Sequence, residues 1–73
     1  MNKEILKGKW MQMKGDIRKQ WGKLTDNDIE QIQGDAEKLI GKLQERYAYN
    51  RQQAEKELDN YMNQQGDKSR RTA

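Results

Sequence analysis

The chain has 73 residues, which is enough for one domain with a single small core. Hydrophobic residues make up 32% of the sequence and charged residues 37%, a balance between ordinary globular proteins and disordered chains. Cysteine and histidine are both absent, which excludes disulfides, thiolate chemistry and histidine metal sites. Neither an apolar secretion signal nor an apolar span of membrane length is present, so we expect a cytoplasmic protein.

Charge is distributed unevenly along the chain. Residues 1–24 carry seven basic side chains against two acidic ones, a net charge of +5. Residues 25–34 carry three acidic side chains and no basic one, and the remaining residues add +1, which gives the total of +3. The sequence therefore predicts a basic first segment, the kind of surface that attracts anionic partners.

A first helix is predicted from an uninterrupted spacing of three and four residues between apolar side chains. These side chains form a narrow amphipathic stripe: Leu6, Trp10, Met13, Ile17, Trp21 and Leu24. Gly22 is a suitable C-terminal stop for this helix. Lys19 and Lys23 lie close to that end, where the helix dipole favours positive charge.

A second helical segment begins after Thr25, whose hydroxyl is a typical N-cap and is followed by carboxylates in the first turn. Its apolar face consists of Ile29, Ile32, Ala36, Leu39, Ile40, Leu43 and Tyr47. Periodicity alone accepts one helix over residues 26–47, whereas Gly34 followed by Asp35 is typical of a stop and a restart. Both alternatives remain open at this point.

A last helix is predicted to open at Asn50, which forms a potential capping box with Gln53. Its apolar face consists of Ala54, Leu58, Tyr61 and Met62. Residues 64–73 offer little to bury, so we expect a disordered basic tail after a single domain over residues 1–63. The expected fold is all-α, a small bundle of about four helices arranged as two packed hairpins, with a mobile C-terminal tail.

The order of several short motifs resembles the CsbD-like family over residues 2–62. The runs that show this resemblance are Gly8–Trp10, Lys14–Gly15, Trp21–Asp26, Gly41–Tyr47 and Ala54–Glu55. The resemblance implies a short bacterial general stress-response protein of about four helices, with no established biochemical activity. Ala48 departs from the pattern, because similar proteins often have glycine after the tyrosine.

No catalytic, cofactor or metal site is predicted. Without histidine or cysteine, and with Ser69 as the only serine, the usual pairs of nucleophile and base are impossible. Asp26, Asp28 and Glu30 are placed where a helix N-terminus favours negative charge. With Glu37 they also match four positions of a calcium-binding loop, but Gln31 stands where that loop requires glycine, so a structural role is favoured.

Binding to a partner is the remaining class of function. Trp10 and Trp21 belong to the apolar stripe, so we expect them in the core and not stacked on nucleic-acid bases. The basic first helix leaves weak electrostatic binding to nucleic acid as an alternative. Membrane-surface binding through the apolar face of that helix is another, and it would require the core to open.

Glycines form the one pattern that core packing does not explain. Gly8, Gly15 and Gly22 lie seven residues apart and opposite the apolar stripe, and Gly34 and Gly41 repeat this relation on the second stripe. Glycine inside a helix costs about 1 kcal/mol relative to alanine. One interpretation is a loosely packed small protein; the other is a contact surface for a partner, made of Gly8, Met11, Gly15, Lys7, Lys14 and Arg18.

The sequence therefore predicts a non-enzymatic stress-response protein that acts as an interaction module. The alternative is a hydrophilic protectant that is largely disordered until it is concentrated or dried. An unknown protein partner, a nucleic acid and a membrane surface all remain open, and no small-molecule substrate is inferred.

Overall fold

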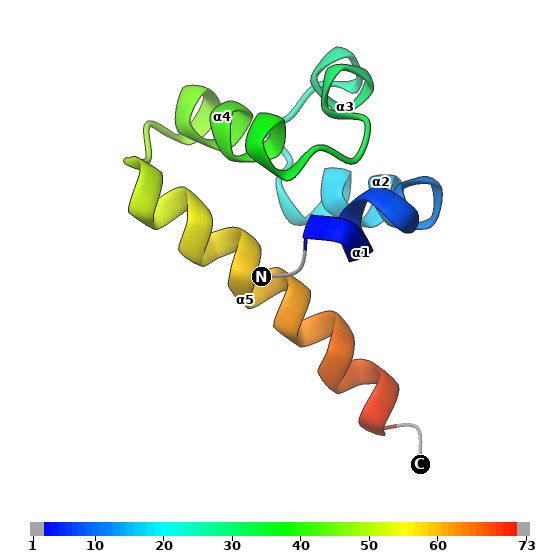
Figure 1. The fold of residues 1–73 in the computed structure, drawn as a ribbon. Coiled ribbons are helices and arrows are strands. Elements are labelled where there is room, and N and C mark those ends of the chain that lie inside the picture. Colours follow the sequence, from blue (N-terminus) through cyan, green and yellow to red (C-terminus); the bar gives the residue numbers. More distant parts are fainter. Residues whose placement is uncertain (1–2, 72–73) are drawn as a thin grey trace.

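The structure, a computed structural model, describes residues 3–71, with side chains described for residues 3–64 (Figure 1). This part of the chain forms five helices and no strand: α1 (Lys3–Gly8), α2 (Trp10–Gln20), α3 (Asp26–Ile32), α4 (Ala36–Tyr47) and α5 (Arg51–Arg71). α4 is the central element, since it contacts α1, α3 and α5. The predicted all-α fold is confirmed. None of the described helices has the length and apolar character needed to cross a membrane.

The predicted first helix is divided at Lys9, which is why five helices form where about four are predicted. The backbone of Lys9 has φ −109° and ψ 16°, outside the usual helical values. Its N–H nevertheless donates to the Ile5 carbonyl at 2.9 Å, and its carbonyl accepts from the Met13 N–H at 2.9 Å. The apolar stripe therefore continues from α1 into α2 despite the distortion.

The segment of residues 26–47 forms two helices, which settles the alternative that the sequence leaves open. Gln33 and Gly34 adopt the left-handed conformation, with φ 45° and 82°, so the chain leaves α3 in a tight turn. Asp35 then caps α4, because its side chain accepts from the backbone N–H groups of Glu37 at 2.9 Å and Lys38 at 3.3 Å.

Gly34 is buried in this turn, so the prediction that it faces away from the core is wrong. A Cβ at this position would lie 3.0 Å from Lys7 Cα and 3.2 Å from Trp10 Cβ. The turn thus packs against the junction of α1 and α2. Glycine is required here both by the positive φ and by the lack of room for a side chain.

The predicted stripes meet in one hydrophobic core. Its members are Leu6, Trp10, Met13, Ile17, Trp21, Leu24, Ile29, Ile32, Ala36, Leu39, Ile40, Leu43, Ala54, Leu58 and Tyr61. Tyr47, Tyr49 and Met62 are partly buried against it. The predicted burial of both indoles is confirmed, with 9% of Trp10 and 3% of Trp21 exposed.

Tyr61 connects α5 to α2 and to Trp21, the residue that follows α2. Its ring lies 5.2 Å from that of Trp21 at an interplanar angle of 57°, a favourable tilted arrangement. Its hydroxyl donates to Asp16 Oδ2 at 2.7 Å. Burial, followed by this hydrogen bond to a carboxylate, raises the pKa of Tyr61 above its ordinary value.

The start of α5 follows the sequence prediction in part. Asn50 Oδ1 accepts from the Gln53 N–H at 2.8 Å, which is the first hydrogen bond of the expected capping box, while the side-chain amide of Gln53 donates to Glu57 at 2.8 Å. The backbone of α5 continues to Arg71. A disordered tail is predicted over residues 64–73. The side chains after residue 64 lie outside the described part of the chain, so the disordered tail stays a prediction.

Replacing Ala48 by glycine is expected to stabilise the protein. Ala48 follows α4 in the left-handed conformation, with φ 56° and ψ 31°, where a Cβ is unfavourable. We expect Ala48→Gly to raise the free energy of unfolding by about 1 kcal/mol, measured by urea titration. The same change at Ala54, buried inside α5, should lower it. A loss of stability in Ala48→Gly would contradict the strained turn.

Candidate functional site

A buried carboxylate organises the polar contacts of the molecule. Asp28 lies in the first turn of α3 and only 1% of it is exposed. Its N–H donates to Thr25 Oγ1 at 3.1 Å, and the Thr25 N–H donates to Asp28 Oδ2 at 3.0 Å. The two residues therefore form a reciprocal capping box, which confirms Thr25 as the N-cap and gives Asp28 a structural role.

Arg46 reaches the same carboxylate from α4. Its Nε donates to Asp28 Oδ2 at 2.8 Å and its Nη2 to Oδ1 at 2.9 Å, a bidentate pair that joins α3 to α4. Lys42 Nζ lies 3.5 Å from Oδ1. The hydrogen bonds from Arg46, which outweigh the effect of burial, hold the pKa of Asp28 well below its usual range.

Tyr47 makes a second set of contacts between distant parts of the chain, next to the Asp28–Arg46 pair. Its hydroxyl accepts from the backbone N–H of Lys23 at 3.2 Å, and the Lys23 ammonium lies 5.2 Å from the centre of its ring. The ring also stacks on Tyr49, with centroids 5.3 Å apart. The runs 21–26 and 41–47, which are far apart in sequence, therefore meet in space and fasten the helices together.

Two of the other carboxylates considered as metal ligands, Asp26 and Glu37, are engaged in separate ion pairs. Asp26 pairs with Arg18, while Glu37 pairs with Lys3 and Arg51. The pKa of Glu37 is lowered to about 2, first by the hydrogen bond from Lys3 and then by that from Arg51. Within residues 3–64, no three acidic side chains converge as a metal site would require.

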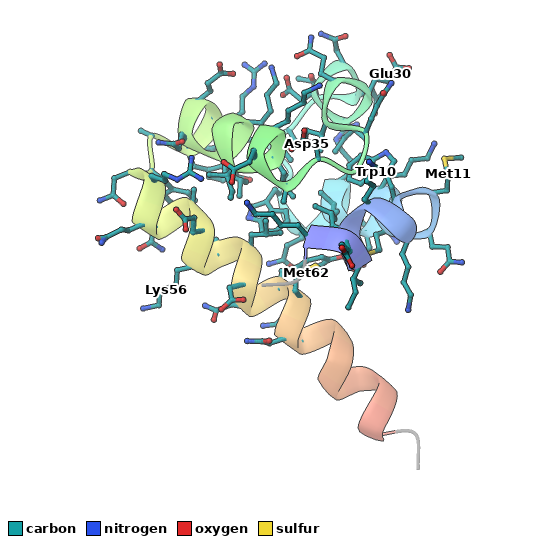
Figure 2. The ribbon with its side chains drawn as sticks, in the orientation of Figure 1. Trp10, Met11, Glu30, Asp35, Lys56 and Met62 are labelled. Carbon is teal, nitrogen blue, oxygen red and sulfur yellow. The ribbon has the colours of Figure 1, made fainter. Side chains whose placement is uncertain are left out.

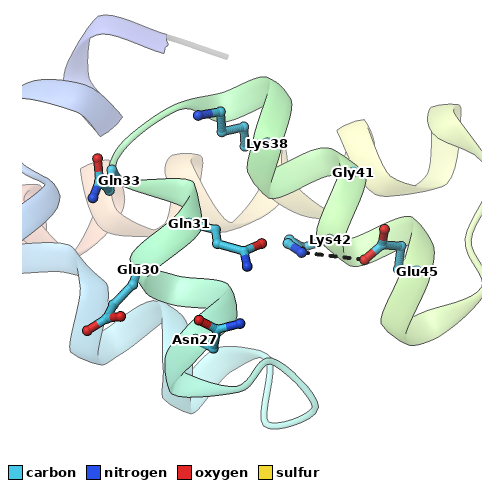
Figure 3. A pocket seen from close by; sticks show the side chains of 8 residues that line it. All are labelled: Asn27, Glu30, Gln31, Gln33, Lys38, Gly41, Lys42 and Glu45. Atoms are coloured by element: carbon cyan, nitrogen blue, oxygen red, sulfur yellow. Dashed lines mark ion pairs between the residues drawn. The ribbon is translucent and has the colours of Figure 1, made fainter.

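A groove of about 640 Å³ runs between α3 and α4 (Figure 3). It is lined by Asn27, Glu30, Gln31, Gln33, Lys38, Gly41, Lys42 and Glu45. The Lys42 ammonium is already paired with Glu45 at 3.6 Å and with Asp28. The groove therefore offers amides and charged side chains, but no nucleophile beside a base.

The predicted contact residues come to the outside of α1 and α2. Met11 is 74% exposed, and Figure 2 shows it pointing away from the body of the protein. A Cβ added at Gly8 or Gly15 would meet no atom within 4 Å. We call the exposed set Gly8, Met11, Gly15, Lys7 and Lys14 the Met11 surface.

Two details refine this surface. Arg18, the sixth predicted member, is half-buried and its guanidinium is engaged by Asp26, so it is held away from a free contact role. A smaller groove of about 310 Å³ lies beside Met11 and Lys14, with Trp10 and Ile29 also lining it. Met11 thus stands at the edge of a shallow hollow between α2 and α3.

The motif runs that meet at Asp28 and Tyr47 also agree with a known family. A family model described as CsbD-like matches residues 4–56, which is most of the chain. The chain belongs to the CsbD-like family. Its relatives include the UPF0337 protein YjbJ of Escherichia coli O6:H1, which is 52% identical over 61 residues, covering 84% of this chain and 88% of YjbJ.

Two further relatives come from other bacteria. The UPF0337 protein PA4738 of Pseudomonas aeruginosa is 48% identical and aligns over 84% of this chain and 94% of its own length. The UPF0337 protein pc0632 of Protochlamydia amoebophila is also 48% identical and aligns over 84% of this chain and 92% of its own length. No solved structure gives a significant match to the CsbD-like chain.

Sequence reasoning missed the roles of Arg46 and Tyr47. Both lie in the run Gly41–Tyr47, which is the most distinctive part of the resemblance to the CsbD-like family, and that distinctiveness was the available signal. What the sequence did not reveal is their partners, since Asp28 lies 18 residues from Arg46 and Lys23 lies 24 residues from Tyr47. The most specific motif of the chain is therefore structural in role.

The Asp28 carboxylate predicts a loss of stability in acid. The native carboxyl stays ionised well below pH 3.8, the ordinary pKa at which the same group takes up a proton in the unfolded chain. Its stabilisation is therefore fully present above about pH 5 and is lost as the pH falls toward the native pKa. We expect Asp28→Asn to cost about 2 kcal/mol at pH 7 and to flatten this pH dependence.

Urea unfolding followed by tryptophan fluorescence between pH 2 and pH 7 measures the effect. Asp26→Asn is the matched control, because Asp26 lies in the same turn with its side chain 94% exposed. It should change stability by less than about 0.5 kcal/mol. An Asp28→Asn variant that keeps the acid dependence of the parent protein would contradict the role of the Asp28–Arg46 pair.

Proposed function

We propose that this CsbD-like chain is a non-enzymatic bacterial stress-response protein that acts as an interaction module through the Met11 surface. The observation that carries the proposal is the exposure of Met11, the most exposed large apolar side chain among the described residues. Methionine is flexible and polarisable and is enriched at binding surfaces. An exposed methionine between lysines suits a contact role, since the core is complete without it.

The two glycines support the same site. Gly15 lies inside α2, where glycine lowers helix stability by about 1 kcal/mol relative to alanine. No neighbouring atom occupies the space that a side chain at Gly15 would fill, so packing does not require glycine there. The same holds for Gly8. In contrast to Gly34, these positions gain nothing from within the fold, so their bare backbone serves close approach from outside.

A folded interaction module is favoured over a disordered protectant by the specificity of its internal contacts. A bidentate ion pair on the buried Asp28 carboxylate, reciprocal capping at Thr25 and a single core over α1 to α5 all require one defined arrangement. A protectant that works by composition alone would not depend on single residues. The two candidates therefore differ in how they respond to small surface changes.

The test replaces Gly8 and Gly15 together by alanine. We expect this variant to be more stable, by about 1 kcal/mol or more, yet to protect a bacterial strain that lacks its own CsbD-like protein less well under stress. The reason is that two added methyl groups separate a partner from the helix backbone. Survival counts and urea unfolding are measured on the same variants.

Gly41→Ala is the matched control, because Gly41 lies inside α4 and is equally open to a side chain. It should stabilise the protein and leave survival unchanged. If the Gly8/Gly15 variant protects as well as the parent protein, the Met11 surface has no role in the stress response.

A further inference from the structure

We propose that the partner of the Met11 surface is an anionic lipid membrane, to which the folded protein binds from outside. This inference rests on the proposed function, because it names the partner of the same surface. It follows from two features of α1 and α2 that occur together: basic side chains without acidic partners, and exposed apolar side chains.

Positive charge is left unneutralised mainly on α1 and α2. Four lysines there are exposed and form no ion pair with any described residue: Lys7, Lys9, Lys14 and Lys19. On α4 and α5, Lys42, Arg46 and Arg51 are each paired with carboxylates, and only Lys38 and Lys56 are exposed without an ion pair among the described lysines and arginines of these helices. The negative surface potential of anionic lipids attracts such unpaired lysines when they lie within about one Debye length of the membrane.

Exposed apolar side chains occur on the same two helices. Within the described residues the large exposed hydrophobic side chains are Met11, 74% exposed, and Ile5, 44% exposed. Lys14 follows Met11 by three residues within α2, so their side chains are neighbours on that helix, and Lys7 lies near the end of α1. An apolar side chain between lysines is the arrangement of helices that lie at a membrane surface.

The core stays closed in this mode of binding. Membrane binding through the apolar face of the first helix, the alternative that the sequence suggests, would require the core to open. Trp10 and Ile17 are buried, however, whereas 74% of Met11 in the same helix is exposed, so Met11 can contact a membrane while the core stays closed. Gly8 and Gly15 leave the backbone beside Met11 bare, so the helix can approach the lipid head groups closely.

Nucleic acid fits the same surface less well. Single-strand binders stack bases on exposed aromatic rings, and both tryptophans of this chain are buried. A phosphate backbone would use the lysines but would leave Met11 without a role. A lipid surface accounts for both the charge and the apolar side chain.

The experiment is flotation of the full chain with vesicles of phosphatidylglycerol and phosphatidylcholine, compared with phosphatidylcholine alone. We expect binding only to the anionic vesicles, weakening as salt increases. Lys7→Gln/Lys14→Gln should weaken it roughly thirtyfold, because each lysine near an anionic surface accounts for about a fivefold change. Met11→Ser should weaken it roughly tenfold, with little dependence on salt.

The control is Lys38→Gln/Lys56→Gln, which removes the same charge from α4 and α5. Both side chains are exposed, and Figure 2 shows Lys56 on the side away from Met11. This variant should weaken binding less than threefold. Thermal unfolding of each variant checks that these exposed substitutions leave the fold intact.

Three outcomes would overturn the lipid inference. The first is no binding to anionic vesicles, the second is equal weakening by the two double lysine variants, and the third is full binding by Met11→Ser. Binding of duplex DNA in place of vesicles, reduced by Lys7→Gln/Lys14→Gln but not by Met11→Ser, would assign the surface to nucleic acid. If vesicles fail while Gly8→Ala/Gly15→Ala still impairs survival, the lipid partner is wrong and the contact surface stands.

Discussion

Burial of every apolar stripe in one small core is the constraint on which the rest of this structure depends. A chain of 73 residues cannot build a second core, so the stripes of five helices have only one another to cover. Both indoles are used in this way, and Trp21 also packs against Tyr61 of the last helix. What remains exposed is therefore mainly polar and charged side chains, bare backbone, Ile5 and Met11, and the proposed function follows from these exposed groups.

The polar joint at Asp28 sets the geometry of this core. Hydrophobic stripes alone would let the helices shift along one another. A carboxylate held by the N-cap Thr25 and by two of the three guanidinium nitrogens of Arg46 permits one arrangement of α3 against α4. Tyr47, one residue further on, extends the joint to the backbone before α3. The family motif thus stabilises a scaffold, and function is to be sought on the surface that the scaffold presents.

The sequence is informative where one helix decides the outcome by itself. Apolar spacing predicts the core, and the short polar side chains of Thr25 and Asp35 predict where α3 and α4 begin. The sequence does not predict features that depend on packing against a second helix. The distortion at Lys9 leaves the hydrogen bonds on either side and the apolar spacing unchanged, so no pattern reveals it. The burial of Asp28 depends on Arg46, and the tight packing of Gly34 depends on α1 folding over it. The contact surface was predicted from glycine spacing, but only the structure shows that Arg18 is engaged by Asp26.

The most direct test of the account is the environment of Trp10 and Trp21 in the native monomer. Because both indoles are buried, we expect blue-shifted tryptophan emission that is shielded from acrylamide. Both properties should be lost in one cooperative transition as urea unfolds the chain. Emission at the wavelength of free tryptophan in water, with full quenching in the absence of urea, would contradict it. In that case the helices do not cover one another, and the Met11 surface would no longer be the apolar contact that the fold leaves exposed.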